Sequence, residues 1–536
     1  MGEFRRGTLA VMAAHLFAGL LFLAPGYIRP DSIATYQYVR SAVFDGDFSF
    51  FNEWSMSGLV RGGVTLFSEV TRTGALSNHW WIGTSILTAP FYLAARAVDT
   101  FAGATAAPGF LGLYGVVLAW CSVLFAAIAM AVAWRFVRES VGPARAAFVV
   151  AAISLGTPLF FYTFRLPLGT HAAGAMCVAL MIAALRIDDD RRGGLAVGLA
   201  AGLAIATRLQ HFVLIPALIY AGVSAKRPRS WWTRAIGGGA LPLIAQAIAW
   251  WSIYGTPLGP LTGGANLQGT TWMPFQHIAL AEALLSSYHG LFSWSPLAVL
   301  SVAGWFLGLK RDRRLALTLL LMFAGEWVAN GTFDRYFWGG TSFGARRFVD
   351  LAVPFAIGLA WLVAEWRGAI VVAVPLVAWS MALMIAASDG ALSLARYVSA
   401  SELFEAARTL RPFPLHLPPP SQTLIAICVV AVVCAIVVAM RRRIVGFATA
   451  YSVIVVCAVL VVALRTPAAA RRDAVRLHID MRASSQLGPL YDERTLLGDE
   501  IAWARATGHL DRAASTSREV AAIDRLTRAI EQGGTR

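Results

Sequence analysis

Apolar runs alternate with short polar segments along most of the 536-residue chain. Runs of roughly 17–25 residues, the length that crosses a bilayer core, recur between residues 8 and 464. The pattern predicts an all-α, polytopic helical membrane protein of about 13 transmembrane helices. The predicted spans are residues 8–28, 109–134, 146–163, 171–187, 193–207, 209–224, 235–254, 290–309, 315–330, 347–364, 368–387, 422–440 and 444–464.

A long, mostly polar stretch, residues 29–108, separates the first predicted span from the second. Within it, residues 82–98 are apolar enough to span, and the orientation of all later helices depends on whether they do. If they lie along the membrane surface, Arg135, Arg138 and nearly every later arginine cluster fall in the cytoplasm, as the positive-inside rule requires. We therefore expect residues 29–108 to form a first extracytoplasmic loop with juxtamembrane helices.

The predicted spans divide the chain into two regions. Residues 1–465 are predicted to form a transmembrane module, and residues 466–536 a polar tail rich in Arg, Asp and Glu with helical runs. An odd number of spans beginning in the cytoplasm places this tail outside. The tail is expected to be a small extracytoplasmic helical appendage, packed on the outer loops.

Composition agrees with this class, since 57% of the residues are hydrophobic and 14% are charged. The formal net charge of +15 is spread over short loops between spans, which argues for membrane orientation and against a nucleic-acid partner. The five cysteines lie within predicted spans and have neither zinc-site nor disulfide-framework spacing. Lys226 and Lys310 are the only lysines among 45 basic residues, which indicates a GC-rich bacterial genome.

Asp31 is the first candidate catalytic residue, because it follows Pro30 at the outer mouth of the first span. A carboxylate at the edge of the bilayer costs free energy unless it is solvated, so its presence there favours a functional role. It can act as an N-cap for an amphipathic helix over residues 33–44, as a general base, or as both. Asp47 is the next candidate for the base.

Arginines and histidines on the predicted outer face are the candidates for substrate binding. The positive-inside rule disfavours arginine on the outer face, so binding of an anionic ligand explains these arginines as well as a structural role does. Asp350 lies four residues after Arg346 and is expected to pair with it. The candidates are Arg346, Arg347, Arg208, His289, His79, Arg165 and His171.

A short N-terminus, one span, an Asp at the head of a long outer loop and many later spans resemble the C-type membrane glycosyltransferases. These include protein O-mannosyltransferases and the transferase that adds aminoarabinose to lipid A. The resemblance extends over most of residues 1–390. It rests on Ser77-Asn78-His79-Trp80-Trp81-Ile82-Gly83 before Pro90-Phe91, on Gly156-Thr157-Pro158 through His171, and on Trp338 through Pro354.

The resemblance implies an inverting transfer of a sugar from a polyprenyl-phosphate carrier to an acceptor hydroxyl outside the cytoplasm, with Asp31 as general base. It also implies a bacterial inner-membrane enzyme whose active site faces the periplasm or exterior, with a glycan, lipid or protein as acceptor. Many members carry a second acidic residue where this chain has Ser32, so we expect no metal and no other cofactor.

Two alternatives remain open from the sequence. One is a transporter or flippase for a lipid-linked substrate, against which stand the lack of an internal repeat and the scarcity of charge within the spans. The other is a polymerase or ligase of surface polysaccharide, which uses a lipid-linked oligosaccharide.

Overall fold

The fold is taken from a computed structural model that describes residues 2–24, 30–103, 109, 112–262, 275, 278–333, 337–409, 411–415, 417–439 and 443–533. Residues 29 and 104–108 of the expected first loop lie outside the described part. The first half of the chain forms α1 (Gly2–Phe22), α2 (Pro30–Phe44), α3 (Phe51–Met56), the antiparallel pair β1 (Val60–Arg61) and β2 (Val64–Thr65), α4 (Gly83–Phe101), α5 (Leu113–Val141), α6 (Pro143–Gly156), the π-helix η1 (Phe161–Arg165), α7 (His171–Ala184), α8 (Asp190–Thr207), the 3-10 helix η2 (Leu209–Leu214), α9 (Ile215–Ser224) and α10 (Arg229–Tyr254).

In the second half, all the elements of the described residues are helices. It forms the 3-10 helix η3 (Gly259–Thr262), α11 (Leu280–Leu285), α12 (Leu291–Trp294), α13 (Leu297–Gly308), α14 (Arg313–Thr332), the 3-10 helix η4 (Arg346–Leu351), α15 (Ala352–Glu365), α16 (Ala369–Ser388), α17 (Ala400–Arg408), α18 (Pro420–Ala439), α19 (Ile444–Arg476), α20 (Met481–Ala506) and α21 (Leu510–Gly533).

The prediction of an all-α, polytopic membrane fold is confirmed. Seven helices in the described chain are long and apolar enough to cross a membrane, and five shorter apolar helices accompany them. Every predicted span except residues 193–207 overlaps one of these helices, so the count of thirteen is not confirmed. That exception corresponds to α8, which opens with Asp190-Arg191-Arg192 and is otherwise rich in glycine and alanine.

Glycines let α8 pack directly on the backbone of α10. Gly194, Gly198 and Gly202 recur every fourth residue on α8, and a Cβ at any of them would overlap a main-chain carbonyl of α10. Spacing of this kind brings two helices together in a membrane, where hydrophobic burial supplies no force between them. The α8–α10 contact therefore depends on van der Waals packing of bare backbone.

Helix α2 is buried from Ser32 through Ser41, so the expectation of an amphipathic helix is wrong. Polar groups on it have internal partners: the backbone carbonyl of Ala34 accepts from Asn78 Nδ2 at 2.9 Å, and that of Thr35 accepts from Ser85 Oγ at 2.8 Å. The helix that carries Asp31 is thus held as a core element, which fixes the direction of its first turn.

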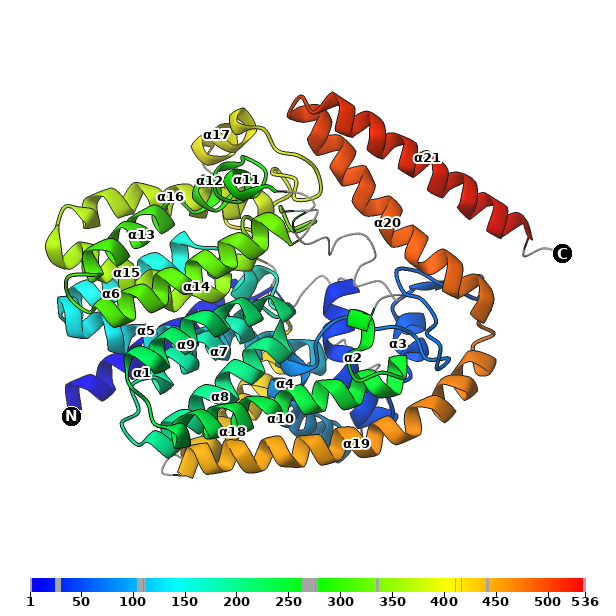
Figure 1. Ribbon diagram of the computed structural model, residues 1–536, viewed down its shortest axis with the longest axis horizontal. Helices are drawn as coiled ribbons and strands as arrows, with labels where there is room; N and C mark the ends of the chain where they lie inside the picture. The colour runs from blue at the N-terminus through cyan, green and yellow to red at the C-terminus, as the bar shows by residue number, and fades with distance from the viewer. Residues whose placement is uncertain are drawn as a thin grey trace.

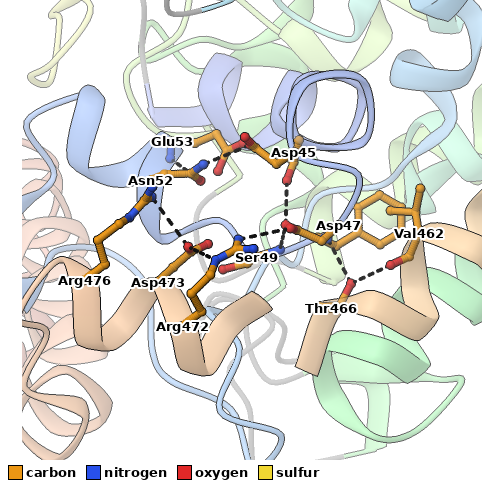
Figure 2. A network of polar contacts seen from close by, with 12 residues as sticks. Asp45, Asp47, Ser49, Asn52, Glu53, Val462, Thr466, Arg472, Asp473 and Arg476 are labelled. Carbon is orange, nitrogen blue, oxygen red and sulfur yellow. Dashed lines mark hydrogen bonds and ion pairs between the residues drawn. The ribbon is translucent and has the colours of Figure 1, made fainter. Parts of the chain in front are cut away.

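Helix α19 and the tail wrap around the first loop (Figure 1). At 33 residues, α19 is about 50 Å long and continues through the expected boundary at residue 466. Its final turns meet the first loop in a network of polar contacts (Figure 2), in which Arg472 contacts the buried Asp47 at 3.5 Å. The backbone N–H of Phe48 donates to Thr466 Oγ1 at 2.9 Å in the same network.

The tail also contacts a segment from the second half of the chain. Trp503 of α20 stacks on Trp338, with ring centroids 5.6 Å apart, and Tyr288 packs against Trp338 in the same small buried cluster. Helix α21 packs along α20 (Figure 1). The division at residue 466 stays a proposal, but in the described residues the tail is joined to both loops around the candidate site.

We predict that Gly198→Ala destabilises the protein, because the new Cβ overlaps the Ala235 carbonyl and forces α8 away from α10. Overpacking of this kind costs about 1–3 kcal/mol. The measurement is the unfolding temperature in detergent. Gly237→Ala on α10 is the matched control, because a Cβ there meets nothing within 4 Å, and it should be neutral or stabilising. Equal effects of both substitutions would contradict the packing argument.

Candidate functional site

Five of the eight sequence candidates line a single cavity of about 210 Å³. The cavity lies where the first turn of α2, the loop before α4, the start of α7, the end of α8 and the start of η4 meet. Its walls carry carboxylate, guanidinium, imidazole, hydroxyl and indole groups. They comprise Asp31, Ser32, Thr35, His79, Trp80, Trp81, Tyr162, Leu166, Gly169, Thr170, His171, Thr207, Arg208 and Arg346.

Asp31 lies in the first turn of α2, which begins one residue earlier at Pro30, so the expected N-cap role is wrong. The positive end of the helix dipole favours a carboxylate in this turn. Oδ2 of Asp31 lies 3.4 Å from Nη1 of Arg346. The two side chains are 49% and 26% exposed, so this is an open ion pair on the cavity wall, with access for a ligand.

Arg346 is positioned by the loop that precedes it. Gly339 has φ +75°, and a Cβ there would lie 3.1 Å from Nε of Arg346, so the glycine supplies both the backbone conformation and the room. Three residues before Arg346, the backbone N–H of Phe343 donates to the Tyr162 hydroxyl at 2.8 Å. Tyr162 itself belongs to the π-helix η1, an element that occurs often at functional sites.

Arg208 is held by three side chains at the inner wall. Its Nη1 lies 2.6 Å from Nδ1 of His171 and 3.1 Å from Oδ2 of Asp350, and Nη2 donates to Gln210 at 2.8 Å. Asp350 is fully buried, and the guanidinium side chain is 13% exposed. The expected pairing of Asp350 with Arg346 is therefore wrong: its partner is Arg208.

The geometry of η4 explains the different pairing. Residues 346–351 form a 3-10 helix, in which side chains three apart are aligned. Side chains four apart then point about 120° away from each other around the axis. The rule for pairs four residues apart applies to an α-helix. Arg346 consequently faces the cavity, while Asp350 points into the protein toward Arg208.

His211 completes the buried charge cluster. Its Nδ1 lies 2.7 Å from the Ala204 carbonyl, and its Nε2 lies 2.9 Å from Oδ2 of Asp350. A carbonyl only accepts, so Nδ1 donates to Ala204, and Nε2 faces the Asp350 carboxylate. Gly174 leaves room for this carboxylate, because a Cβ there would lie 2.5 Å from its Oδ1.

The two cavity histidines present uncharged faces to a ligand. His171 is 6% exposed and packs on Tyr162 with ring centroids 4.1 Å apart. His79 packs on Trp80 at 3.7 Å, and its Nε2 is buried without a hydrogen-bond partner. Burial lowers the pKa of His79 to about 3, so it is a neutral imidazole at physiological pH. It contributes hydrogen bonding and no positive charge.

Three candidates lie away from the cavity wall. Arg165 directs its guanidinium over the Phe413 ring at 5.1 Å and donates to the Phe22 carbonyl at 3.4 Å. His289 is 1% exposed, has φ +64° and hydrogen-bonds the Trp338 carbonyl at 3.0 Å, so it supports the loop that leads to Arg346. Arg347 is not among the described cavity residues, and its carbonyl accepts from Gln210 at 2.9 Å.

Sequence reasoning missed several parts of the site. Thr35 and Tyr162 line the cavity, and Gln210 and His211 hold Arg208 and its partner. The segment Arg208-Leu209-Gln210-His211 between two apolar helices was the available signal for the last two, because three polar residues are seldom placed this close together at a membrane boundary without partners. No comparable signal marks Thr35 or Tyr162.

Residues 110–251 match the sequence profile of the dolichyl-phosphate-mannose-protein mannosyltransferase family. The resemblance to C-type membrane glycosyltransferases is thereby confirmed at the level of the superfamily. The matched segment contains Arg165, His171 and Arg208, whereas Asp31 and Arg346 lie outside it.

Two solved structures show a structural likeness to this chain. They are crystal structures of ArnT from Cupriavidus metallidurans, one bound to undecaprenyl phosphate and one in the apo state. Both are 15% identical to this chain, cover 88% of it and 77% of their own length, and have TM-scores of 0.42 and 0.40. Comparison with curated proteins gave no match.

We predict that Asp350→Asn lowers the free energy of unfolding by about 3–5 kcal/mol, because it leaves Arg208 buried without a counter-charge. Chemical unfolding in detergent measures this loss. The matched control is Glu365→Gln, which breaks an ion pair with Arg311 whose side chains are 51% and 34% exposed, and it should cost less than about 1 kcal/mol. Comparable losses from both substitutions would show that the buried network is not what stabilises this region.

Proposed function

We propose that the protein is a polyprenyl-phosphate-sugar-dependent glycosyltransferase that acts with inversion at the extracytoplasmic face of a bacterial inner membrane. The observation that carries this proposal is the open contact between Asp31 and Arg346 on one cavity wall. It joins a group that can take a proton to a group that can bind a phosphate. The match of residues 110–251 to mannosyltransferases supports the same reaction class.

Donor binding would separate the two charges. An ion pair as exposed as Asp31–Arg346 is worth about 0–1 kcal/mol, so little is lost when it opens. A phosphate offers Arg346 shorter, bidentate and charge-assisted hydrogen bonds. Arrival of the phosphate therefore releases the Asp31 carboxylate toward the acceptor, and the base becomes available only when the donor is in place.

The reaction follows from these positions. The acceptor hydroxyl attacks the anomeric carbon on the face opposite the phosphate, and its proton passes to Asp31. The bond from the anomeric carbon to the phosphate oxygen breaks, and its electron pair leaves with the polyprenyl phosphate. Arg346 and Arg208 stabilise this growing negative charge. Attack from the opposite face inverts the configuration at the anomeric carbon.

Other cavity groups bind and orient the reactants. Trp80 and Trp81 line the wall and can stack on a sugar ring, while neutral His79 and Thr35 can hydrogen-bond its hydroxyls. In this proposal Arg208 serves as a fixed positive charge, since Asp350, His171 and Gln210 already hold it in place. Arg346 is the cation that exchanges partners. The acceptor is a glycan, a lipid or a protein hydroxyl.

Incubation of the purified protein with polyprenyl-phosphate sugars and a mixed acceptor extract tests the reaction class. Release of polyprenyl phosphate together with a glycosylated acceptor is the expected result. A requirement for lipid-diphosphate oligosaccharides would indicate a polysaccharide ligase or polymerase instead. Movement of lipid-linked substrate across vesicles without bond cleavage would indicate a flippase.

Asp31→Asn should lower turnover by roughly 10²-fold or more, because the amide cannot accept the acceptor proton. The protein should still fold, since the amide has nearly the shape of the carboxylate and Asp31 is half exposed. The measurement is polyprenyl-phosphate release at saturating donor, alongside the unfolding temperature. Asp47→Asn is the comparison, because Asp47 faces Arg472 in the tail network, and it should affect stability more than chemistry. Near-normal turnover in Asp31→Asn would exclude Asp31 as the base.

Arg346→Lys should weaken donor affinity by about 10- to 100-fold, nearly as much as Arg346→Ala, because lysine cannot form the bidentate phosphate contact. Equilibrium binding of a labelled polyprenyl-phosphate sugar measures this. The neighbouring Arg347→Lys is the matched control and should have a smaller effect, as Arg347 is not among the described cavity residues. The proposed phosphate site is wrong if Arg347→Lys is the more damaging of the two.

A further inference from the structure

A second cavity lies at the other end of the same helices. Its volume is about 120 Å³, which is room for about four water molecules. It is formed by the end of α5, the ends of α7 and α9, and the starts of α10 and α14. Helix α7 begins at His171 in the Asp31 cavity and ends beside Leu185 in this one, about 20 Å away. The two cavities therefore open at opposite ends of the membrane-spanning bundle.

Three arginines from separate segments meet in this second cavity: Arg186, Arg227 and Arg314. Asp312 is the one acidic residue among the described lining residues. Its carboxylate already caps α14 by accepting from the Leu315 N–H at 3.0 Å. Two of the arginines also have acidic partners outside the lining, Glu139 for Arg186 and Asp190 for Arg227. This is the end of the bundle where the arginine-rich loops predict the cytoplasm.

The arginines differ in how firmly they are held. Arg227 is fixed, since it contacts Asp190 at 2.9 Å and donates to the carbonyls of Leu185 and Ile187. Arg186 contacts Glu139 at 2.6 Å, but both side chains are about half exposed, so this pair is weak and can exchange. Arg314 is exposed at the cavity rim. One guanidinium thus forms the floor of the site, while two others can close on a ligand.

Two helix starts favour an anion in the same place. The first turns of α10 and α14 also contribute to the lining, and helix N-termini attract negative charge.

An exposed apolar stripe leads away from the cavity along α9. Ile215, Ile219 and Val223 recur every fourth residue and are 41%, 49% and 63% exposed. The last of them adjoins Ala221 and Gly222, which line the cavity. A soluble phosphate makes no favourable contact with an apolar stripe, whereas the acyl chains of a phospholipid would pack along it.

We propose that this cavity binds the phosphate headgroup of an anionic phospholipid at the cytoplasmic face, with the acyl chains along α9. Basic pockets between membrane helices on the cytoplasmic side recognise such headgroups. The site is separate from the Asp31 cavity and does not depend on the reaction carried out there. It joins the ends of five helices, so an occupied site stabilises the bundle at the end away from the catalytic cavity.

The test uses the full-length protein purified in detergent, with native mass spectrometry and thermal unfolding as readouts. Phosphatidylglycerol is the probe, phosphatidylcholine is the neutral lipid control, and inorganic phosphate is the soluble control. Arg314→Gln should weaken phosphatidylglycerol retention about five-fold, the effect of one basic side chain near an anionic headgroup. Arg313→Gln is the matched control, because Arg313 is equally exposed on the same turn but does not line the cavity. Arg186→Gln and its exposed control Arg191→Gln form a second pair.

The expected result is that phosphatidylglycerol is retained and raises the unfolding temperature, and that Arg314→Gln and Arg186→Gln lose both effects while their controls keep them. All four variants should unfold at the wild-type temperature without added lipid, since the altered side chains are exposed. Equal retention of phosphatidylcholine, or equal losses in the control variants, overturns the proposal. Stabilisation by inorganic phosphate alone, lost in Arg314→Gln, would reassign the cavity to a soluble anion.

Discussion

The carboxylate of Asp350 lies between Arg208 and His211 with no access to water, and several segments of the candidate site converge on it. Burying a guanidinium at this depth is tolerated only with a counter-charge and satisfied hydrogen bonds. Asp350 on η4 supplies the counter-charge. His171, at the start of α7, accepts a hydrogen bond from Arg208, and Gln210 links Arg208 to the buried Glu326 of α14. Helix η4 begins with Arg346 and also carries Asp350, so the pairing of Asp350 with Arg208 sets the direction in which Arg346 points. The exposed ion pair of Arg346 with Asp31 thus depends on the buried ion pair of Arg208 with Asp350.

This arrangement separates two kinds of positive charge within one cavity. Arg208 is fixed by partners that no ligand has to displace, whereas Arg346 makes one long contact to a half-exposed carboxylate. A site that binds a charged lipid phosphate and then releases it needs both properties. In the proposed function, Arg208 holds the phosphate at a fixed place, and the exchangeable contact of Arg346 keeps the bound state from becoming too stable. Gly339 serves the second property, because it has φ +75° and a Cβ there would lie 3.1 Å from Nε of Arg346.

The helices could be predicted from the sequence because the bilayer imposes one simple demand, an apolar stretch of about 20 residues. Asp31, Arg208 and Arg346 were also readable, since each breaks the rules of charge placement near a membrane. What could not be read was anything set by contacts distant in sequence. The burial of α2 depends in part on α4, where Ser85 donates to the Thr35 carbonyl across 50 residues of sequence. The partner of Asp350 depends on η4 being a 3-10 helix. In an α-helix, Asp350 would lie on the same face as Arg346, four residues earlier, whereas in the 3-10 helix it points to Arg208.

The tail also affects the site indirectly, through contacts with the loop that carries Arg346. Trp503 stacks on Trp338, whose carbonyl accepts from His289, and Ser342 also donates to that carbonyl. The loop from Trp338 to Arg346 is rich in glycine and would be costly to order by itself, because glycine has the most conformational freedom to lose. Packing of α20 against its first residue and the Tyr162 hydroxyl bond near its end together restrict the loop at both ends. His289, expected at first to touch substrate, therefore acts through the backbone of this loop, and the tail and the π-helix hold Arg346 where Asp31 can reach it.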